Sequence, residues 1–368
     1  MHPQAAHAGA ILTVDLDALR SNYRLLRKQA GSAACGAAVK ADAYGLGAER
    51  VGPALAAEGC RHFFVAHLDE GIALRPHLPA TAQVFVLHGP PPGTGQEFIR
   101  HGLTPVLNSL QQIQDWHALA QALQRPLPAI VQVDSGMSRM GLPAAEAAAW
   151  LAHPLYRQTI PPLFLMSHLA CAEHQDHPMN ASQLARFKAF RQRLPQVPAS
   201  LANSSGIFLG SDYQFDLVRP GAALYGIAPV AGAANPLQPV AALHGRILQT
   251  RTIERGDHVG YGISYSATEQ RQIATVGVGY ADGWLRAMSN RGVAFIDGKA
   301  APMVGTVSMD SITIDVTGIA AERLQAGALV ELIGPSRPVD DVARLAGTIG
   351  YEILTGLGMR YYREYVGQ

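Results

Sequence analysis

The stretch AAVKADAYGLG (residues 37–47) places a lysine at the end of a short apolar run. The run at residues 35–39 is typical of a buried strand, and a helical pattern follows over residues 48–58. A lysine at the exit of a buried strand loses hydration, which lowers its pKa and favours Schiff-base chemistry. The same spacing fits a lysine whose amine reaches solvent, so this stretch alone leaves both interpretations open.

Length and composition predict a globular protein of two domains. The chain has 368 residues, of which 48% are hydrophobic and 15% charged. A net charge of +1 gives no electrostatic reason to expect binding to nucleic acid or to a membrane surface. Cys35, Cys60 and Cys171 are too widely spaced for a disulfide framework, which favours a reducing, cytoplasmic compartment. Residues 1–10 show no signal-peptide pattern and are expected to be loosely ordered, and no stretch is apolar enough to span a membrane.

Short apolar segments alternate with helical patterns through the first two-thirds of the chain. The predicted strands lie at residues 11–16, 35–39, 63–66, 84–87, 105–107, 129–133, 163–166, 200–202 and 214–218. Asp17 and Ser109 are the expected N-caps of two of the intervening helices. This order predicts a parallel sheet covered by helices, and about eight strands favour a closed (β/α)8 barrel over an open sheet.

The pattern changes after the predicted barrel, where alternating strands replace the strand–helix order. These strands are predicted at residues 245–253, 271–277, 292–296, 311–316 and 329–333. Asp297-Gly298 between two of them is a strong hairpin signal. We expect a barrel over residues 11–235, and a mostly antiparallel β domain over residues 236–368 that contains one helix near residues 339–346.

Polar residues follow several of the predicted barrel strands, at the end where barrel enzymes build their active sites. They are Lys40, Tyr44, the loop at residues 134–139, Ser167, His168 and the loops at residues 203–206 and 219–222. The last two loops consist largely of small residues whose backbone N–H groups can hold a phosphate. Each loop alone is weak support for a ligand site, because glycine-rich turns are common.

Longer motifs resemble those of the bacterial alanine racemase family. The motifs are AVKADAYG (38–45), VDSGMSRMG (133–141), RPGAALYG (219–226), GYG (260–262), GYADG (279–283) and VSMD (307–310). They occur in order over nearly the whole chain. The resemblance implies a fold type III enzyme with a (β/α)8 barrel and a β domain. It also implies pyridoxal phosphate as cofactor and interconversion of L-alanine and D-alanine, which serves peptidoglycan synthesis or alanine catabolism.

The resemblance also implies roles for individual residues. Lys40 would carry the cofactor and act as one catalytic base, and Tyr261 would be the second base, contributed by the partner subunit of a homodimer. The implied cofactor-binding residues are Lys40, Tyr44, His168, Asn203, Ser204, Arg219, Gly221 and Ala222. The implied substrate-binding residues are Arg139, Met309 and Asp310, with Tyr280 and Arg286 in the outer corridor.

Arg219 separates the alternatives on the same fold. It matches an arginine that faces the pyridine nitrogen of the cofactor, and a guanidinium does not give up its proton at ordinary pH. Amino-acid decarboxylases of the related fold use a carboxylate there, and RPG has none. A non-catalytic carrier of the cofactor would be a single-domain barrel, so the β domain with Tyr261 argues against that class. A racemase of broader specificity, acting for example on serine, stays open.

Three positions depart from the family pattern. Gln132 stands where many members have a carbamylated lysine that positions the arginine seven residues on, here Arg139. Gly358 falls near the place of a tyrosine that acts as a gate, and Thr306 stands where an arginine often lines the corridor. We expect no carbamate at Gln132. A less obstructed entrance could admit side chains larger than the methyl group of alanine.

A run of potential metal ligands follows the last residue of one predicted strand. His168, Cys171, His174 and His177 lie at intervals of three. Zinc sites usually combine a close pair of ligands with a distant second pair, and this run would have to be helical to converge. We expect no metal site, but one functional histidine followed by a polar loop.

Overall fold

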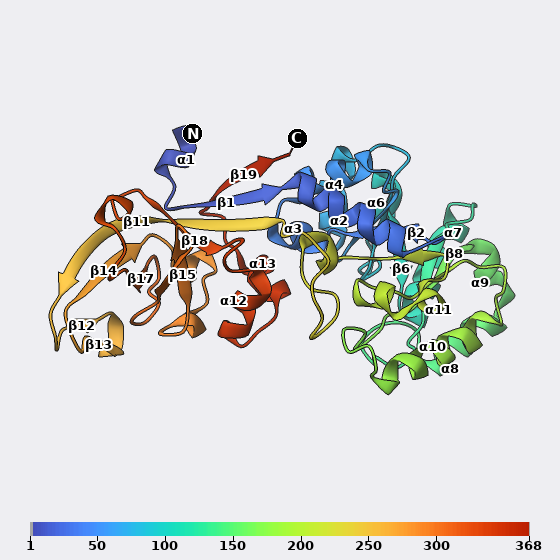
Figure 1. The fold of residues 1–368 in the computed structure, drawn as a ribbon. Helices are drawn as coiled ribbons and strands as arrows, with labels where there is room; N and C mark the ends of the chain where they lie inside the picture. Colours follow the sequence, from blue (N-terminus) through green and yellow to red (C-terminus); the bar gives the residue numbers. More distant parts are fainter. Residues whose placement is uncertain (1–2, 368) are drawn as a thin grey trace. The chain divides into compact units, whose positions relative to one another are not determined.

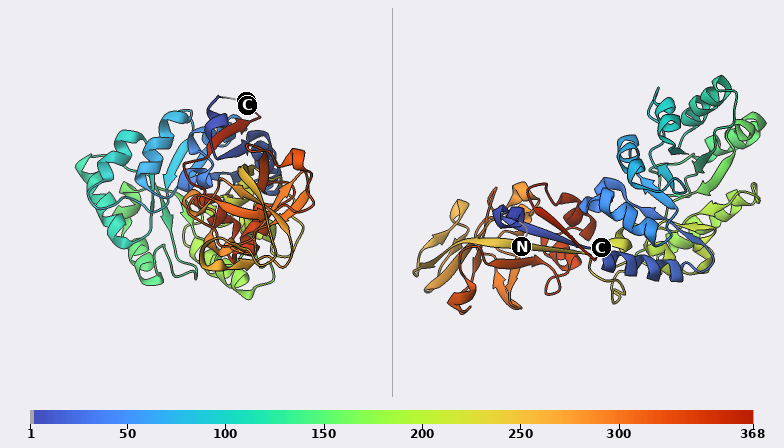
Figure 2. Two further views of the ribbon diagram at one scale, coloured as in Figure 1. Left: turned by 90° about the vertical axis from the view of Figure 1, so that its left-hand side faces the viewer. Right: turned by 90° about the horizontal axis from the view of Figure 1, so that it is seen from above.

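The computed structural model describes residues 3–367, which divide into two compact units. The barrel unit comprises residues 19–224 and 228–237. The β unit comprises the residues before 19, residues 225–227 and those from 238 onward. Figure 1 labels the elements of both units, and Figure 2 shows the same ribbon from two further directions.

A parallel sheet forms the centre of the barrel unit, with seven strands in the order β3-β4-β5-β6-β7-β8-β9. These strands are β3 (Ala37–Ala38), β4 (His62–Val65), β5 (Gln83–Val86), β6 (Thr104–Leu107), β7 (Ala129–Gln132), β8 (Pro162–Met166) and β9 (Ala199–Ser200). β10 (Leu217–Val218) pairs with β2 (Ala34–Cys35), and the N–H of Arg219 donates to Ala202 O at 2.9 Å beyond β9. These bonds close the sheet, so the predicted (β/α)8 barrel is confirmed.

One side chain from each of several successive strands fills the barrel. The cluster consists of Ala38, Phe64, Phe85, Val106, Ile130, Met166 and Leu217, all buried. The helices that follow the strands lie outside them, as Figure 1 shows. They are α2 (Leu16–Gln29), α4 (Ala48–Ala57), α5 (Leu68–Leu74), α6 (Gly95–His101), α7 (Leu110–Ala122), α8 (Ala144–Ala152), α9 (Pro154–Thr159), α10 (Pro178–Arg191) and α11 (Ser211–Gln214). Because the strands are parallel, the polar loops after them gather at one end of the barrel.

One of the two predicted helix caps is confirmed. Ser109 Oγ accepts the N–H of Gln112 at 3.2 Å at the start of α7. The expectation for Asp17 is wrong, because Asp15 Oδ1 accepts the N–H groups of Asp17 and Ala18, both at 2.9 Å. The helix begins at Leu16, one residue after a strand ends, so the acceptor comes from the strand rather than from the first helical turn.

The β unit contains an eight-stranded sheet with the order β16-β15-β18-β11-β1-β19, to which β14 and β17 attach beside β11. Its strands are β1 (Ala10–Asp15), β11 (Ala241–Ile253), β14 (Arg271–Val276), β15 (Val293–Ile296), β16 (Lys299–Pro302), β17 (Ile312–Asp315), β18 (Leu329–Ile333) and β19 (Tyr362–Val366). β12 (His258–Val259) and β13 (Tyr265–Ser266) form a small separate ribbon. Except for the parallel pair β1–β19, its pairings are antiparallel.

The strand near residue 11 corrects one expectation. It was predicted to open the barrel, but β1 pairs antiparallel with β11 and parallel with β19. Leu12 and Val14 are fully buried, so the local pattern identifies a strand without identifying its sheet. The segment before it is not loose, because residues 3–7 form α1 (Pro3–His7) and Arg246 binds the carbonyls of Ala5 and Ala8. Residues 1–2 lie outside the described chain.

Turn and helix signals in the β unit agree with the structure. Asp297 and Gly298 have φ values of 48° and 76°, and they join β15 to β16 in the predicted hairpin. The predicted helix is α12 (Val339–Ala346), which a second helix, α13 (Gly350–Gly356), follows. Within residues 3–367, none of the helices combines the length and the apolar character needed to cross a membrane.

Candidate active site

Lys40 stands directly after β3, where the chain makes a left-handed turn. The N–H of Val39 still donates to Phe64 O at 2.9 Å, and the four residues Ala41 to Tyr44 then have φ values of 52° to 57°. A left-handed conformation costs about 1–2 kcal/mol for each residue that carries a Cβ. Two backbone hydrogen bonds of 2.9 Å close the turn, from Ala43 to Val39 and from Gly47 to Asp42. The segment after the lysine is therefore a defined, strained turn.

The surroundings of Lys40 lower its pKa. Burial is the main cause, the positive charge of Arg139 adds to it, and the carboxylate of Glu70 opposes it. Arg139 lies in the loop after β7, and Glu70 lies in the first turn of α5, after β4. A larger fraction of neutral amine is thus present at neutral pH than an exposed lysine would have, which favours nucleophilic attack on a carbonyl carbon.

Glu70, which sequence reasoning missed, connects the Lys40 turn to the start of α5. Its Oε1 accepts the N–H of Ala41 at 2.7 Å, and its Oε2 accepts those of Ala66 and His67 at 2.6 and 3.1 Å. A glutamate three residues after an N-cap is a signal that a sequence can provide. The contact with Ala41 is non-local and has no such signal.

The loops after β9 and β10 form an anion cradle. Ser204 Oγ accepts the N–H groups of Gly221 and Ala223 at 2.9 and 3.2 Å. In the part of the chain that the structure describes, the N–H of the buried Ala222 has no hydrogen-bond partner. A Cβ at Gly221 would collide with the Tyr44 hydroxyl, so the backbone and the phenol approach closely only because this residue is glycine. Hydroxyl and backbone N–H donors converging in this way suit a phosphate group.

Asn203 has a different place from the other residues of this cradle. Its Oδ1 accepts the N–H of Gly206 at 2.9 Å and so shapes the loop itself. It lies beside Ser204, as the sequence predicts, and the carbonyl end of its amide is already engaged. The contribution of Asn203 to an anion site is therefore to hold the loop that presents Ser204.

Arg219 is buried beneath the cradle and contacts His168. Its Nη1 donates to Ser200 Oγ, and its Nη2 donates to Ser167 O at 2.8 Å and lies 3.4 Å from His168 Nδ1. Burial lowers the pKa of Arg219 to about 9, which leaves it charged at neutral pH. Burial and the charges of Arg219, Arg139 and Lys40 lower the pKa of His168 to about 3, so this imidazole is neutral.

Arg139 is exposed, and the loop before it is held by the side chain of Asp134. Asp134 Oδ1 accepts the N–H groups of residues 136, 137 and 138 at 2.8, 2.9 and 3.2 Å. Gln132, at 7% exposure, packs under Gly141. Among the described residues no hydrogen bond joins Gln132 to Arg139, so the neutral amide does not orient this arginine through a direct bond.

The remaining candidate residues gather on the surface of the β unit. Tyr261, Met309 and Tyr280 are 74%, 52% and 43% exposed. Thr306 Oγ1 donates to Tyr261 O at 2.9 Å, and the N–H of Ala281, next to Tyr280, donates to Met309 O at 2.9 Å. Each of these three large side chains is thus exposed to solvent, and large apolar groups are seldom exposed in number without a partner.

Asp310 on this surface is held by Arg360. Arg360 Nη1 donates to Asp310 Oδ1 at 2.7 Å, and Nε donates to the buried Asp282 at 2.6 Å. The position near the expected gate is Gly358, which has no side chain. Its N–H donates to Asp282 O at 2.9 Å, which fixes its backbone. Met359 beside it is 81% exposed. Arg286, placed in the outer corridor by resemblance, is also exposed.

The run from His168 to His177 is a series of turns and not a helix. His177 Nδ1 accepts the N–H of Met179 at 3.2 Å and caps α10, and Cys171 Sγ points to Asn180 Oδ1 at 3.7 Å. Over residues 3–367, no group of three or more His, Cys, Asp or Glu side chains has a metal-binding arrangement.

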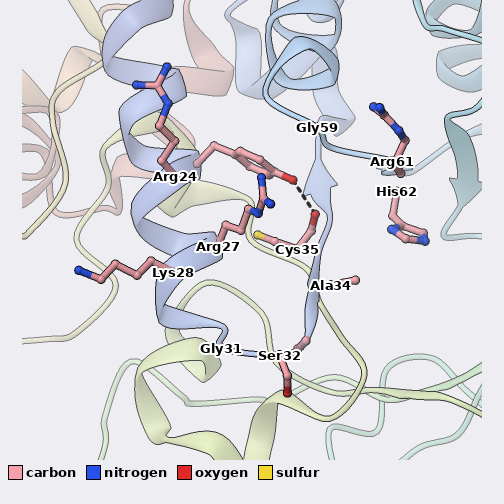
Figure 3. A pocket seen from close by; sticks show the side chains of 12 residues that line it. Arg24, Arg27, Lys28, Gly31, Ser32, Ala34, Cys35, Gly59, Arg61 and His62 are labelled. Carbon is pink, nitrogen blue, oxygen red and sulfur yellow. Dashed lines mark hydrogen bonds between the residues drawn. The ribbon is translucent and has the colours of Figure 1, made fainter.

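A basic cavity of about 600 Å³ lies at the other end of the barrel strands, before β2 and β4. Figure 3 shows Arg24, Arg27 and Lys28 along α2 beside it. Three of its cations already have partners in the protein, because Arg24 pairs with Glu58 at 2.6 Å, Arg27 donates to Glu58 O at 3.4 Å, and Arg61 donates to two backbone carbonyls at 3.2 Å. Arg27 and Lys28 stand in the last turn of α2, where cations stabilise the helix C-terminus. This cavity therefore has a structural explanation and is separate from the loops around Lys40.

The barrel loops thus define a class of enzyme that holds a phosphorylated carbonyl cofactor through a lysine. Residues 14–229 match the model of the alanine racemase N-terminal domain, and residues 240–365 match that of the C-terminal domain. A catabolic alanine racemase of Mesorhizobium japonicum is 51% identical over 362 residues, which cover 98% of this chain and 94% of that protein. An alanine racemase of Brucella abortus is 49% identical, with coverage of 98% and 94%.

Solved structures give the same result. The crystal structure of alanine racemase from Bartonella henselae, with covalently bound pyridoxal phosphate, matches with a TM-score of 0.94 and 43% identity. The match covers 98% of this chain and 100% of that one. Alanine racemase from Streptomyces coelicolor matches with a TM-score of 0.93 and 33% identity over 99% of each chain. The chain belongs to the alanine racemase family.

Proposed function

We propose that this chain is a pyridoxal-phosphate-dependent racemase that interconverts L-alanine and D-alanine with Lys40 and Tyr261 as its two bases. The observation that carries the proposal is the place of Lys40, an amine of lowered pKa beside a prepared anion cradle and Arg139. The alanine racemase relatives, one of them catabolic, support the reaction. Both a biosynthetic and a catabolic use of that reaction are compatible with the site.

The residues of the barrel fit the cofactor. Lys40 would hold its carbonyl carbon, while Tyr44, Ser204 and the N–H of Ala222 would hold its phosphate, with Gly221 bonded to Ser204 Oγ beside them. When bound, the cofactor withdraws electrons from the substrate and acidifies its Cα–H bond. Arg219 would face the ring nitrogen with a charge that stays in place at neutral pH, which restrains electron flow into the ring and limits side reactions.

Racemisation needs one group to remove a proton from one face of the substrate and another to deliver a proton to the opposite face. The Lys40 amine, whose pKa is lowered mainly by burial, suits the first task. The Tyr261 hydroxyl suits the second, but a phenol has an ordinary pKa near 10 and needs help from neighbouring groups. We assign that help to the neutral His168 and to Arg219 behind it. Arg139 would bind the substrate carboxylate, a task that suits its planar fork of donors.

A homodimer with shared sites completes the arrangement. Tyr261 and Met309 are more than half exposed, and Asp310 lies next to them. We infer that this surface enters the barrel loops of a partner subunit, which would explain why apolar groups of this size face solvent. The free thiols of Cys35, Cys60 and Cys171 support work in a reducing, cytoplasmic compartment.

The test combines the cofactor with the reaction. The purified protein should take up pyridoxal phosphate, develop a yellow, borohydride-reducible chromophore, and destroy the optical rotation of L-alanine. In heavy water it should exchange the Cα proton of both enantiomers. Release of carbon dioxide without racemisation would instead identify a decarboxylase, and a chromophore without either reaction would identify a carrier.

A broader substrate range is a second candidate. Gly358 offers no side chain near the expected gate, and Thr306 is a small residue bonded to Tyr261 O. We infer that the entrance admits serine and larger amino acids. Measured kcat/KM values for a panel of side chains decide this, and a value for serine below about a thousandth of that for alanine would exclude breadth.

A further inference from the structure

We propose that Glu70 is a positioning residue that fixes the strained turn carrying Lys40. The proposal concerns the shape of the turn, and it rests on the proposed function only in taking Lys40 as the reactive amine. Glu70 lies on α5, after the neighbouring strand β4, and touches no substrate-binding group named above.

One carboxylate collects three backbone donors from two loops. Oε1 accepts the N–H of Ala41 at 2.7 Å, and Oε2 accepts those of Ala66 and His67 at 2.6 and 3.1 Å. The N–H of Ala41 belongs to the peptide plane that begins at Lys40, so a bond to it fixes the direction in which the chain leaves the lysine. The strands before these loops are adjacent and parallel, since Ala38 pairs with Phe64.

Helix capping explains only half of this geometry. A glutamate at the third helical position ordinarily binds the N–H of its own N-cap, which here is His67. The bond from the other oxygen to Ala41 spans 29 residues and adds nothing to the cap. It is made to a turn of Ala, Asp, Ala and Tyr, in which no glycine relieves the left-handed conformation. Such a turn persists only when its surroundings hold it.

Three variants separate positioning from capping. Glu70→Gln keeps the length of the side chain, but its amide nitrogen cannot accept, so one set of donors loses its partner. Glu70→Asp keeps a carboxylate that can cap α5 and is one methylene too short to reach both loops. Glu146→Gln is the matched control, because Glu146 Oε2 accepts the N–H of Leu110 at 2.6 Å in a different part of the barrel.

Amide hydrogen exchange on the cofactor-free protein reads the turn directly. In Glu70→Asp the amides of residues 41–47 should exchange at least about tenfold faster than in wild type, while those of residues 68–74 keep wild-type protection. In Glu70→Gln exchange should rise over whichever of these two segments loses its acceptor. The dissociation constant for pyridoxal phosphate should rise about tenfold in Glu70→Asp, and kcat should fall more than KM rises. Glu146→Gln should leave all of these values unchanged.

Unchanged exchange over residues 41–47 in Glu70→Asp would overturn the proposal. Faster exchange confined to residues 68–74 in that variant, or an equal effect in Glu146→Gln, would also overturn it, because the residue would then be a helix cap or a general stabiliser. A wild-type protein that fails to bind pyridoxal phosphate would refute the proposed function without affecting the exchange result. The two failures are therefore distinguishable.

Discussion

Nη2 of Arg219 lies 3.4 Å from Nδ1 of His168, so a lasting positive charge faces an imidazole largely removed from water. The same Nη2 donates to the carbonyl of Ser167, which fixes the guanidinium against the end of β8. A protonated His168 would meet this charge and those of Arg139 and Lys40. The pair thus keeps the imidazole neutral, and its neutrality has a measurable effect on folding.

Acidification should weaken the cofactor-free protein through His168. Its folded pKa is about 3, while an unfolded histidine titrates near 6.5, so the unfolded chain binds more protons between these values. The free energy of unfolding is therefore lost as pH falls below about 6.5, by about 1–2 kcal/mol down to pH 5. Urea unfolding measured at about pH 6.5 and at about pH 5 should show this loss in wild type and not in His168→Gln. An equal loss in the two proteins would mean that His168 is protonated in the folded state.

Removing the charge of Arg139 should raise the pKa of Lys40. The positive charge of Arg139 is the second cause of the lowered pKa, after burial. In the cofactor-free Arg139→Gln variant, the NMR signal of ¹³C-dimethylated Lys40 should titrate at higher pH than the same signal in wild type. Arg100→Gln is the control, because Arg100 pairs with Glu97 on α6 and does not act on Lys40. High salt should shrink the difference, since Arg139 is exposed. A pKa that is unaltered at low salt would contradict this account.

A methyl group at Gly221 should damage the cradle. In Gly221→Ala the new Cβ meets the Tyr44 hydroxyl, and Ala38 Cβ lies 3.2 Å away, so the phenol or the loop must move. We expect destabilisation of about 1–3 kcal/mol and weaker binding of pyridoxal phosphate, measured by thermal unfolding and by absorbance. In Gly356→Ala the nearest heavy atom is 4.0 Å from the new Cβ, and both values should stay at wild type. Normal cofactor affinity in Gly221→Ala would show that the cradle is elsewhere.

Mixed dimers test whether Tyr261 acts across the subunit boundary. Lys40→Ala and Tyr261→Phe should each be nearly inactive alone. When they are mixed and exchanged, half of the dimers are hybrids, and each hybrid has one site with both bases intact. Activity should recover to about a quarter of wild type. No recovery, with hybrids shown by native mass spectrometry, would place both bases in one subunit.

Arg360 should govern how well the site holds substrate. It binds Asp310 and the buried Asp282 together, so Arg360→Gln frees the Asp310 carboxylate. We expect KM for alanine to rise about 3–10-fold with a smaller change in kcat. Arg323→Gln removes an exposed pair with Asp297 and should change neither constant. A loss confined to kcat would assign Arg360 to the chemical step.

Local sequence patterns predicted most of the fold. They failed where the position of a strand depends on partners that are distant in the sequence. Ser109 and Asp297-Gly298 act on their immediate neighbours, so residue type alone identified the cap and the hairpin. The strand near residue 11 was also recognised, but its partners are more than 200 residues away in β11 and β19. Strand periodicity contains no information about such partners.

The site was predicted to a similar extent. Residues at the ends of strands, such as Lys40 and Ser204, were found because topology places them at one end of the barrel. Glu70 was missed because its bond to Ala41 depends on how two loops meet. The left-handed turn was missed because Ala and Tyr give no signal for positive φ, and one Asp among them gives only a weak one.

The pairing of β1 with β19 has a consequence for synthesis on the ribosome. β1 emerges before the barrel strands, whereas its partner β11 is made more than 200 residues later and its partner β19 after that. The barrel strands are complete once residue 219 has emerged, but one apolar edge of β1 stays unpaired until β19 has been made. A nascent chain arrested before residue 362 should therefore expose β1 to chaperones or to β1 of another chain.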